Sequence, residues 1–148
     1  METRQKLDAA LKDAMRSGDE MRKQSVRMVL SAIKLNEVEK GSALDESAII
    51  AIIQKEIKAR SEAMQDANKA GRSDLAEKAQ AETAYLESFL PTQLTADELA
   101  ELVRAAIQEV NAAGPGDMGK VMKILVPKVQ GRAAGNQVSE AVRKLLQS

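Results

Sequence analysis

Apolar residues recur at intervals of three and four positions along most of the chain, and this spacing constrains the fold more than any other feature. Leu7, Leu11 and Ala14 show it near the N-terminus, and Leu99 and Val103 show it in the second half. Such a period is typical of amphipathic helices that bury one face. The sequence therefore predicts an all-α protein.

One apolar string, IIAII at residues 49–53, is also compatible with a buried strand. It lies within about 25 residues that contain no turn signal, and helices rather than strands reach that length, so we expect a helix. Glycine, proline and polar clusters separate the predicted helices at residues 17–19, Gly41, Gly71, Pro91, residues 114–116, Pro127 and residues 131–135. These breaks divide the chain into about seven helices.

Pro91 marks the boundary between two groups of helices. Proline disfavours helical geometry at the preceding residue, here Leu90. Thr95 and Glu98 have the spacing of a capping box at the start of the next helix. We therefore expect an N-terminal four-helix lobe, residues 1–91, followed by a small three-helix C-terminal lobe, residues 92–148.

The fourth helix is expected to begin at a second capping box, formed by Asp74 and Glu77. Its apolar face would contain Leu75, Ala79, Leu86 and Phe89. The second half of the preceding helix carries Arg60, Glu62 and Asp66, and we expect that half to be solvated.

Residues 116–135 concentrate glycine, proline and basic residues. Asp117 is expected to cap a helix with Met118 and Met122 on its buried face. Pro127 is expected to end this helix.

Gly116 and Gly119 flank Asp117 and allow two interpretations. They can permit close approach of the backbone to another helix of the same lobe, or they can expose amides to a phosphate. We favour packing, because the Asp117 carboxylate would repel an anion at that helix terminus.

The chain contains no cysteine and no histidine. Disulfides, thiolate nucleophiles, histidine bases and nearly all zinc or copper sites are thereby excluded. We expect no catalytic residue, no metal and no cofactor. Tyr85 and Phe89 are the only aromatic residues, so the chain offers no stacking platform for unpaired bases.

The N-terminal residues are charged throughout and lack the apolar core of a signal peptide. The longest apolar run is too short to span a bilayer. From these two features we expect a cytoplasmic protein that does not associate with membranes.

Formal net charge is zero, but residues 117–148 hold six basic and two acidic residues. Such a local excess favours contact with phosphates, although a solvated helix face is the commoner explanation. The candidate RNA-binding residues are Lys120, Lys123, Lys128, Arg132, Arg143 and Lys144.

A second basic group, Lys55, Lys58 and Arg60, is interleaved with Glu56 and Glu62. At these spacings opposite charges on one helix lie within reach of each other. For this group we expect intrahelical ion pairs rather than a binding surface.

The order and spacing of several motifs resemble the YqeY-like family, also called GatB/YqeY domain proteins, over essentially the whole chain. These motifs are VRMVLSAIK from Val26, IIQKEIKARSEA from Ile52, AGRSDLAEKAQAE from Ala70, YLESFLPTQLTADEL from Tyr85, DMGKVMKILVPK from Asp117, and GRAAG before the last helix. The chain departs from the family pattern at Ala134, where aspartate is common before Gly135. This departure removes an expected helix cap.

The resemblance implies a helical lobe followed by a three-helix lobe related to the tail of the B subunit of the tRNA-dependent amidotransferase. That tail engages tRNA, whereas the amide-forming chemistry of the larger enzyme belongs to other domains. Association with a glutamine-dependent amidotransferase follows from the resemblance alone.

Catalysis by this chain alone is not supported by its residues. Release of ammonia from glutamine uses an activated cysteine or a serine–lysine arrangement in a glycine-rich loop, and Ser25, Ser31 and Ser61 lie in helical patterns instead. The string GPGDMGK lacks both the spacing and the preceding strand of a phosphate-binding loop.

Three functional hypotheses remain open. The first is a non-catalytic module that contacts tRNA through the basic C-terminal lobe. The second is a scaffold or accessory subunit that binds a component of translation or of the amidotransferase through its N-terminal helices, which exposed leucine or isoleucine would support. The third is a carbon–nitrogen ligase with glutamine as amido-N-donor, which the family resemblance alone implies.

Overall fold

The computed structural model describes residues 2–147, and these residues confirm the all-α expectation. The chain divides into two compact units, Met1–Leu90 and Pro91–Ser148. The first contains α1 (Thr3–Ser17), α2 (Glu20–Lys40), α3 (Glu46–Lys69) and α4 (Ser73–Glu87). The second contains α5 (Ala96–Glu109), the short 3-10 helix η1 (Pro115–Asp117), α6 (Met118–Val129) and α7 (Gly135–Gln147).

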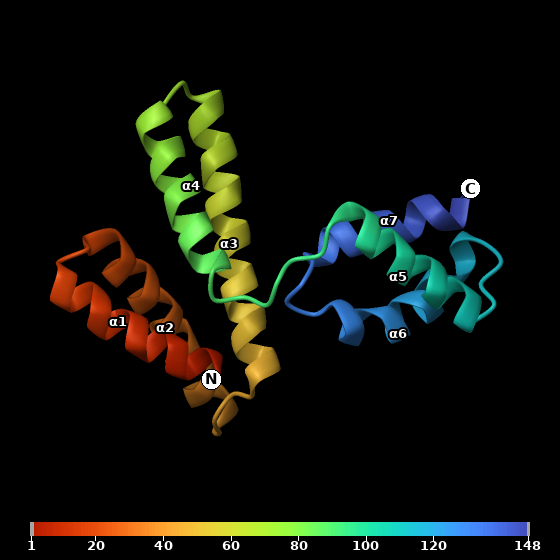
Figure 1. Cartoon of the computed structure of the whole chain (residues 1–148), viewed down its shortest axis with the longest axis horizontal. Helices are drawn as coiled ribbons and strands as arrows, with labels where there is room; N and C mark the ends of the chain where they lie inside the picture. Colours follow the sequence, from red (N-terminus) through yellow and green to blue (C-terminus); the bar gives the residue numbers. More distant parts are fainter. Residues whose placement is uncertain (1, 148) are drawn as a thin grey trace. The chain divides into compact units, whose positions relative to one another are not determined.

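The first unit consists of two helical hairpins, α1 with α2 and α3 with α4 (Figure 1). Gly18 and Gly71 make the turns with φ angles of 71° and 69°, a left-handed geometry that disfavours residues with a Cβ atom. Both hairpins contribute to one apolar core, formed by Leu7, Val26, Val29, Ile33, Ile49, Ile53, Leu86 and Phe89.

Arg60 is a buried charge between the two helices of the second hairpin. Its guanidinium lies 2.7 Å from the Glu56 carboxylate of α3 and 2.8 Å from the Glu82 carboxylate of α4. The predicted intrahelical pair with Glu56 is therefore confirmed. The expectation that this part of α3 is solvated is wrong for Arg60, whose exposed fraction is 7%, because α4 covers it.

The start of α4 also differs from the sequence prediction. The helix begins at Ser73, and Asp74 lies in its first turn, where the carboxylate accepts hydrogen bonds from the Arg72 guanidinium. Leu75 is 46% exposed and does not belong to the buried face, whereas Ala79 and Leu86 do.

The second unit packs α5, α6 and α7 around a separate apolar core. Its buried members are Leu99, Val103, Ala106, Val121, Leu125, Val129, Ala133, Val138, Val142 and Leu146. The predicted capping box is confirmed, because the Thr95 hydroxyl accepts from the Glu98 amide and the Glu98 carboxylate accepts from the Thr95 amide.

The predicted start of α6 after Asp117 is confirmed, but the predicted side-chain cap and the predicted end at Pro127 are wrong. The Asp117 carboxylate accepts a hydrogen bond from the amide of Ala113 at 2.9 Å instead of capping the helix, so the short helix η1 precedes α6. Pro127 lies inside α6, which continues to Val129. Met118 and Met122 are partly buried against the core rather than fully enclosed.

The segment after Pro91 is attached to the loop between α6 and α7. The Leu94 amide donates to the Arg132 carbonyl at 2.8 Å, and the Gln93 side-chain amide donates to the Gly131 carbonyl at 2.7 Å. The Arg132 guanidinium donates to the Thr92 carbonyl at 3.1 Å. Residues 92–94 therefore belong structurally to the second unit.

Candidate nucleic-acid interface

Lys120 and Lys123 share the outward face of α6. Each residue advances about 100° around a helix, so both lysines lie roughly 140–160° from Leu125, which is fully buried. Both side chains are exposed. Lys120 and Lys123 are therefore two of the six candidate residues that lie on the same exposed helix face.

Lys120 lies 3.7 Å from the Asp117 carboxylate. Its side chain is 72% exposed, and such exposed ion pairs contribute little free energy, so the ammonium stays available to a stronger anion. The pKa of Asp117 is lowered mainly by the hydrogen bond from the Ala113 amide, and the charge of Lys120 adds to this effect. Asp117 is thus engaged with the preceding loop, and the first amides of α6 have no side-chain cap.

The glycines beside Asp117 have no packing role within this unit. A Cβ atom added to Gly116 or Gly119 would meet no atom within 4 Å. Neither glycine has a positive φ angle. The expectation that they permit close approach of a neighbouring helix is therefore wrong, and both glycines are exposed.

Lys128 and Arg132 make contacts within their own unit. The Lys128 ammonium lies 3.5 Å from the Glu109 carboxylate of α5. Arg132 is half-buried and binds the Thr92 carbonyl, as described above. Neither contact was visible in the sequence, because the partners lie 19 and 40 residues away.

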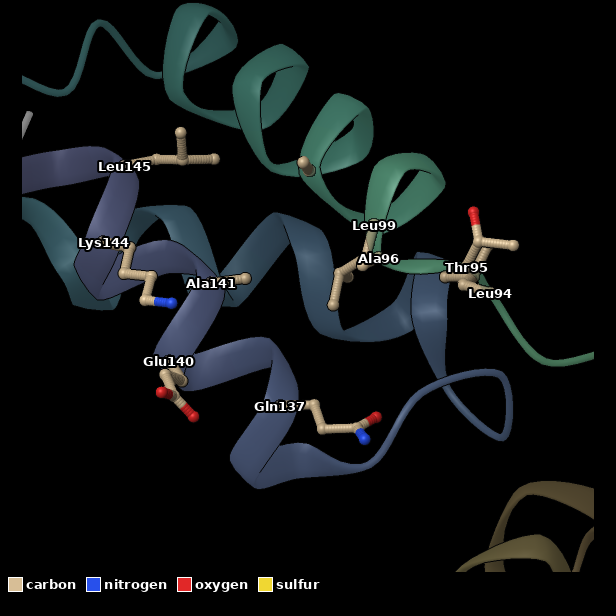
Figure 2. Close-up of a pocket in the computed structure, with 10 residues that line it drawn as sticks. Leu94, Thr95, Ala96, Leu99, Gln137, Glu140, Ala141, Lys144 and Leu145 are labelled. Carbon is tan, nitrogen blue, oxygen red and sulfur yellow. The ribbon is translucent and has the colours of Figure 1, made fainter.

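Arg143 and Lys144 are exposed on α7 but point in different directions, because consecutive helical residues are about 100° apart. Lys144 lines a pocket of about 460 Å³ between the start of α5 and α7, together with Gln137 and Glu140 (Figure 2). Arg143 and Lys144 therefore do not share one face of α7.

The pocket was not found by sequence reasoning. Its apolar lining comes from Leu94, Leu99, Ala100, Ala141 and Leu145, which belong to segments about 40 residues apart. Leu145 is next to the buried Leu146 and packs partly against the core, so apolar spacing does not distinguish it from a core residue. Within residues 2–147, no group of three or more acidic side chains is arranged to hold a metal ion.

Comparison with known proteins identifies the family. A model of the YqeY-like protein family matches residues 4–146. The chain belongs to the YqeY-like family. None of the helices in the described part of the chain combines the length and apolar character needed to cross a membrane.

Three fungal relatives carry the name "Altered inheritance of mitochondria protein 41, mitochondrial". The protein of Pyrenophora tritici-repentis is 32% identical over 145 residues, which cover 95% of this chain and 79% of the relative. The protein of Lachancea thermotolerans is 36% identical over 81 residues, 54% of this chain and 43% of the relative. That of Vanderwaltozyma polyspora is 35% identical over 81 residues and matches over 44% of its own length.

These relatives contradict the expectation of a cytoplasmic location, because all three are named as mitochondrial proteins. The expectation depended on the lack of an apolar leader and of an apolar span. Mitochondrial targeting segments are amphipathic and basic rather than apolar, so neither criterion can distinguish these compartments.

Proposed function

We propose that this YqeY-like protein is a non-catalytic helical module that contacts the phosphate backbone of tRNA. The contact surface is the outward face of α6 with Lys120 and Lys123, next to the exposed glycines Gly116 of η1 and Gly119 of α6. The supporting observation is that nothing in the fold requires glycine at either position. Two exposed lysines on one helix face suit contact with phosphates, and the Asp117 carboxylate beside Lys120 is held by the Ala113 amide.

This surface would read charge and shape rather than base sequence. The second unit contains no aromatic residue on which a base could stack. Affinity should therefore fall steeply as salt concentration rises, because counterions released from the RNA dominate the binding free energy.

The test is a titration of the full chain against bulk tRNA at several salt concentrations. Replacing both lysines, Lys120→Ala with Lys123→Ala, should reduce the slope of log K against log salt by about 2. The matched control is Lys55→Ala with Lys58→Ala, two exposed lysines at the same spacing on α3, and this control should keep the wild-type slope.

A slope near zero for the wild-type chain would contradict the proposal. Equal slopes for the two double variants would also contradict it, since binding would then not depend on this face of α6.

A second candidate function is docking onto a protein partner. The observation in its favour is the exposure of three large apolar side chains on α2, where Leu35 is 60% exposed. Isolated exposed apolar residues are ordinary on proteins, but a row of them on one helix face is a recurrent docking feature.

A further inference from the structure

The outward face of α2 carries an apolar row that is not covered by either hairpin. Met28, Leu35 and Val38 are 53%, 60% and 71% exposed. On the same helix Val26, Val29 and Ile33 are buried. Leu35 lies about 160° around the helix from Ile33, so the row faces away from the core of its unit.

The three positions have the spacing of a helix-binding seam. Met28 and Leu35 are seven residues apart, and Val38 follows three residues later, as apolar positions do where two helices pack side by side. The seam is short, since residues 28–38 rise only about 15 Å along the axis. A stable protein dimer buries about 800 Å² on each partner with 20–30 residues a side, which three side chains do not supply.

One edge of the seam is basic. Arg27 and Lys34 are exposed, seven residues apart and on the same side of the row. Within residues 2–147 neither has a carboxylate at ion-pair distance, whereas Arg22 and Lys23 at the start of the same helix are paired with Asp19 and Glu20. The edge is therefore complementary to an acidic partner.

One end of the seam is held in place by the buried ion cluster. The Arg60 guanidinium lies 3.4 Å from the sulfur of Met28. Because Arg60 is fixed by two carboxylates, Met28 is anchored to α3 on one side and exposed on the other. This end of the row is thus held against α3, while Leu35 and Val38 are exposed on α2.

We propose that this face of α2 binds an amphipathic helix of another protein. The apolar residues of that helix would cover Met28, Leu35 and Val38, and acidic residues along one of its edges would pair with Arg27 and Lys34. The proposal develops the second candidate function and does not depend on RNA contact by α6. The short seam predicts a weak, reversible complex rather than a permanent one.

The probe is a synthetic amphipathic helix of about 21 residues, with leucine on the apolar face, glutamate along one edge and a single tryptophan. The chain itself has no tryptophan, so fluorescence anisotropy reports on the peptide alone. A second peptide carries lysine in place of each glutamate. The full chain should bind the glutamate peptide about tenfold more tightly than the lysine peptide.

Two sets of variants locate the site. Leu35→Ser with Val38→Ser should weaken binding of the glutamate peptide about tenfold, whereas Leu75→Ser, a matched exposed leucine on α4, should not change it. Arg27→Glu with Lys34→Glu should reverse the preference between the two peptides, and Lys55→Glu with Lys58→Glu on α3 should not. Circular dichroism checks that each variant keeps its helices.

Three outcomes would overturn the proposal. The first is equal binding of the two peptides by the wild-type chain, and the second is equal loss in the Leu75→Ser control. The third is a wild-type dimer in analytical ultracentrifugation that Leu35→Ser disperses, because a second copy of the chain would then be the occupant of the seam.

Discussion

Replacing Arg60 with alanine should destabilise the first unit far more than replacing any exposed arginine. The variant leaves Glu56 and Glu82 facing each other without their shared cation. Breaking a buried ion pair by removing one partner typically costs about 3–5 kcal/mol. The side chains of Glu56 and Glu82 are 22% and 18% exposed, so water can partly solvate their carboxylates in the variant. We therefore expect the free energy of unfolding to fall by about 3 kcal/mol, the lower end of this range.

For a unit of this size, a loss of about 3 kcal/mol corresponds to a decrease in Tm of roughly 12–24 °C. The assay can follow the first unit selectively. Tyr85 is the only tyrosine, and its ring lies 5.2 Å from Phe89 and 4.9 Å from the Arg22 guanidinium within that unit. Thermal unfolding monitored by tyrosine fluorescence therefore reports on the hairpins, whereas circular dichroism reports on both units.

The matched control is Arg72→Ala, which removes an arginine whose pair with Asp74 is 58% and 66% exposed. Exposed pairs contribute roughly 0–1 kcal/mol, so the control should shift the tyrosine transition by only a few degrees. Equal shifts for Arg60→Ala and Arg72→Ala would refute the reasoning, because burial would then not determine the strength of the pair.

Two further predictions concern acid stability and the glycines. The pKa of Glu37 is lowered from its ordinary value of 4.5, mainly by the hydrogen bond from the Leu44 amide and also by Arg4. The ionised carboxylate therefore stabilises the fold fully above pH 4.5, and this contribution is lost as the pH falls through the lowered pKa. In urea unfolding between about pH 7 and pH 3, the free energy of unfolding of Glu37→Gln should decline less than that of the wild-type chain. Gly41→Ala should cost about 1 kcal/mol, since Gly41 has a φ angle of 80°, whereas Gly119→Ala should stabilise α6 by roughly 0.5 kcal/mol. Measured in the same tRNA titration, weaker binding by a stabilised Gly119→Ala chain would show that this glycine serves a ligand, and unchanged binding would count against that role.

The helices of the first unit could be predicted because their signals are local. Gly41 follows the last residue of α2 in a left-handed conformation, and Asp45 accepts from the Ala48 amide at the start of α3. Each of these features depends on residues at most four positions apart, which sequence spacing resolves. The same is true of the capping box at Thr95.

The errors have two sources, a competing partner nearby in the sequence and a partner on another helix. Asp117 has the sequence position of a cap, but its carboxylate accepts from the Ala113 amide, and α6 continues two residues past Pro127 to Val129. The charge pattern around Arg60 is typical of a solvated helix, yet Glu82 of α4 lies 22 residues away and buries it. Spacing along one helix does not contain that information.

The candidate binding residues show the same limit. The prediction from local charge places Lys128 and Arg132 in the same group of candidate RNA-binding residues as Lys120 and Lys123. The structure pairs Lys128 with Glu109 and Arg132 with the Thr92 carbonyl, both outside the basic segment, whereas Lys120 is paired with Asp117 of the same segment. At Ala134 only one half of a capping box is present, because the Gln137 side chain accepts from the Ala134 amide at 3.4 Å but alanine has no side-chain oxygen to accept from an amide of the first turn of α7.

The attachment of residues 92–94 to the α6–α7 loop has a practical consequence for protein engineering. The string looks like a dispensable linker, yet Gln93, Leu94 and Thr92 all bond to residues 131–132. A fusion protein that borrows the C-terminal unit should therefore be joined at Pro91. A fusion that starts at Thr95 would keep α5, α6 and α7 but would lose the hydrogen bonds from residues 92–94 to the loop between α6 and α7.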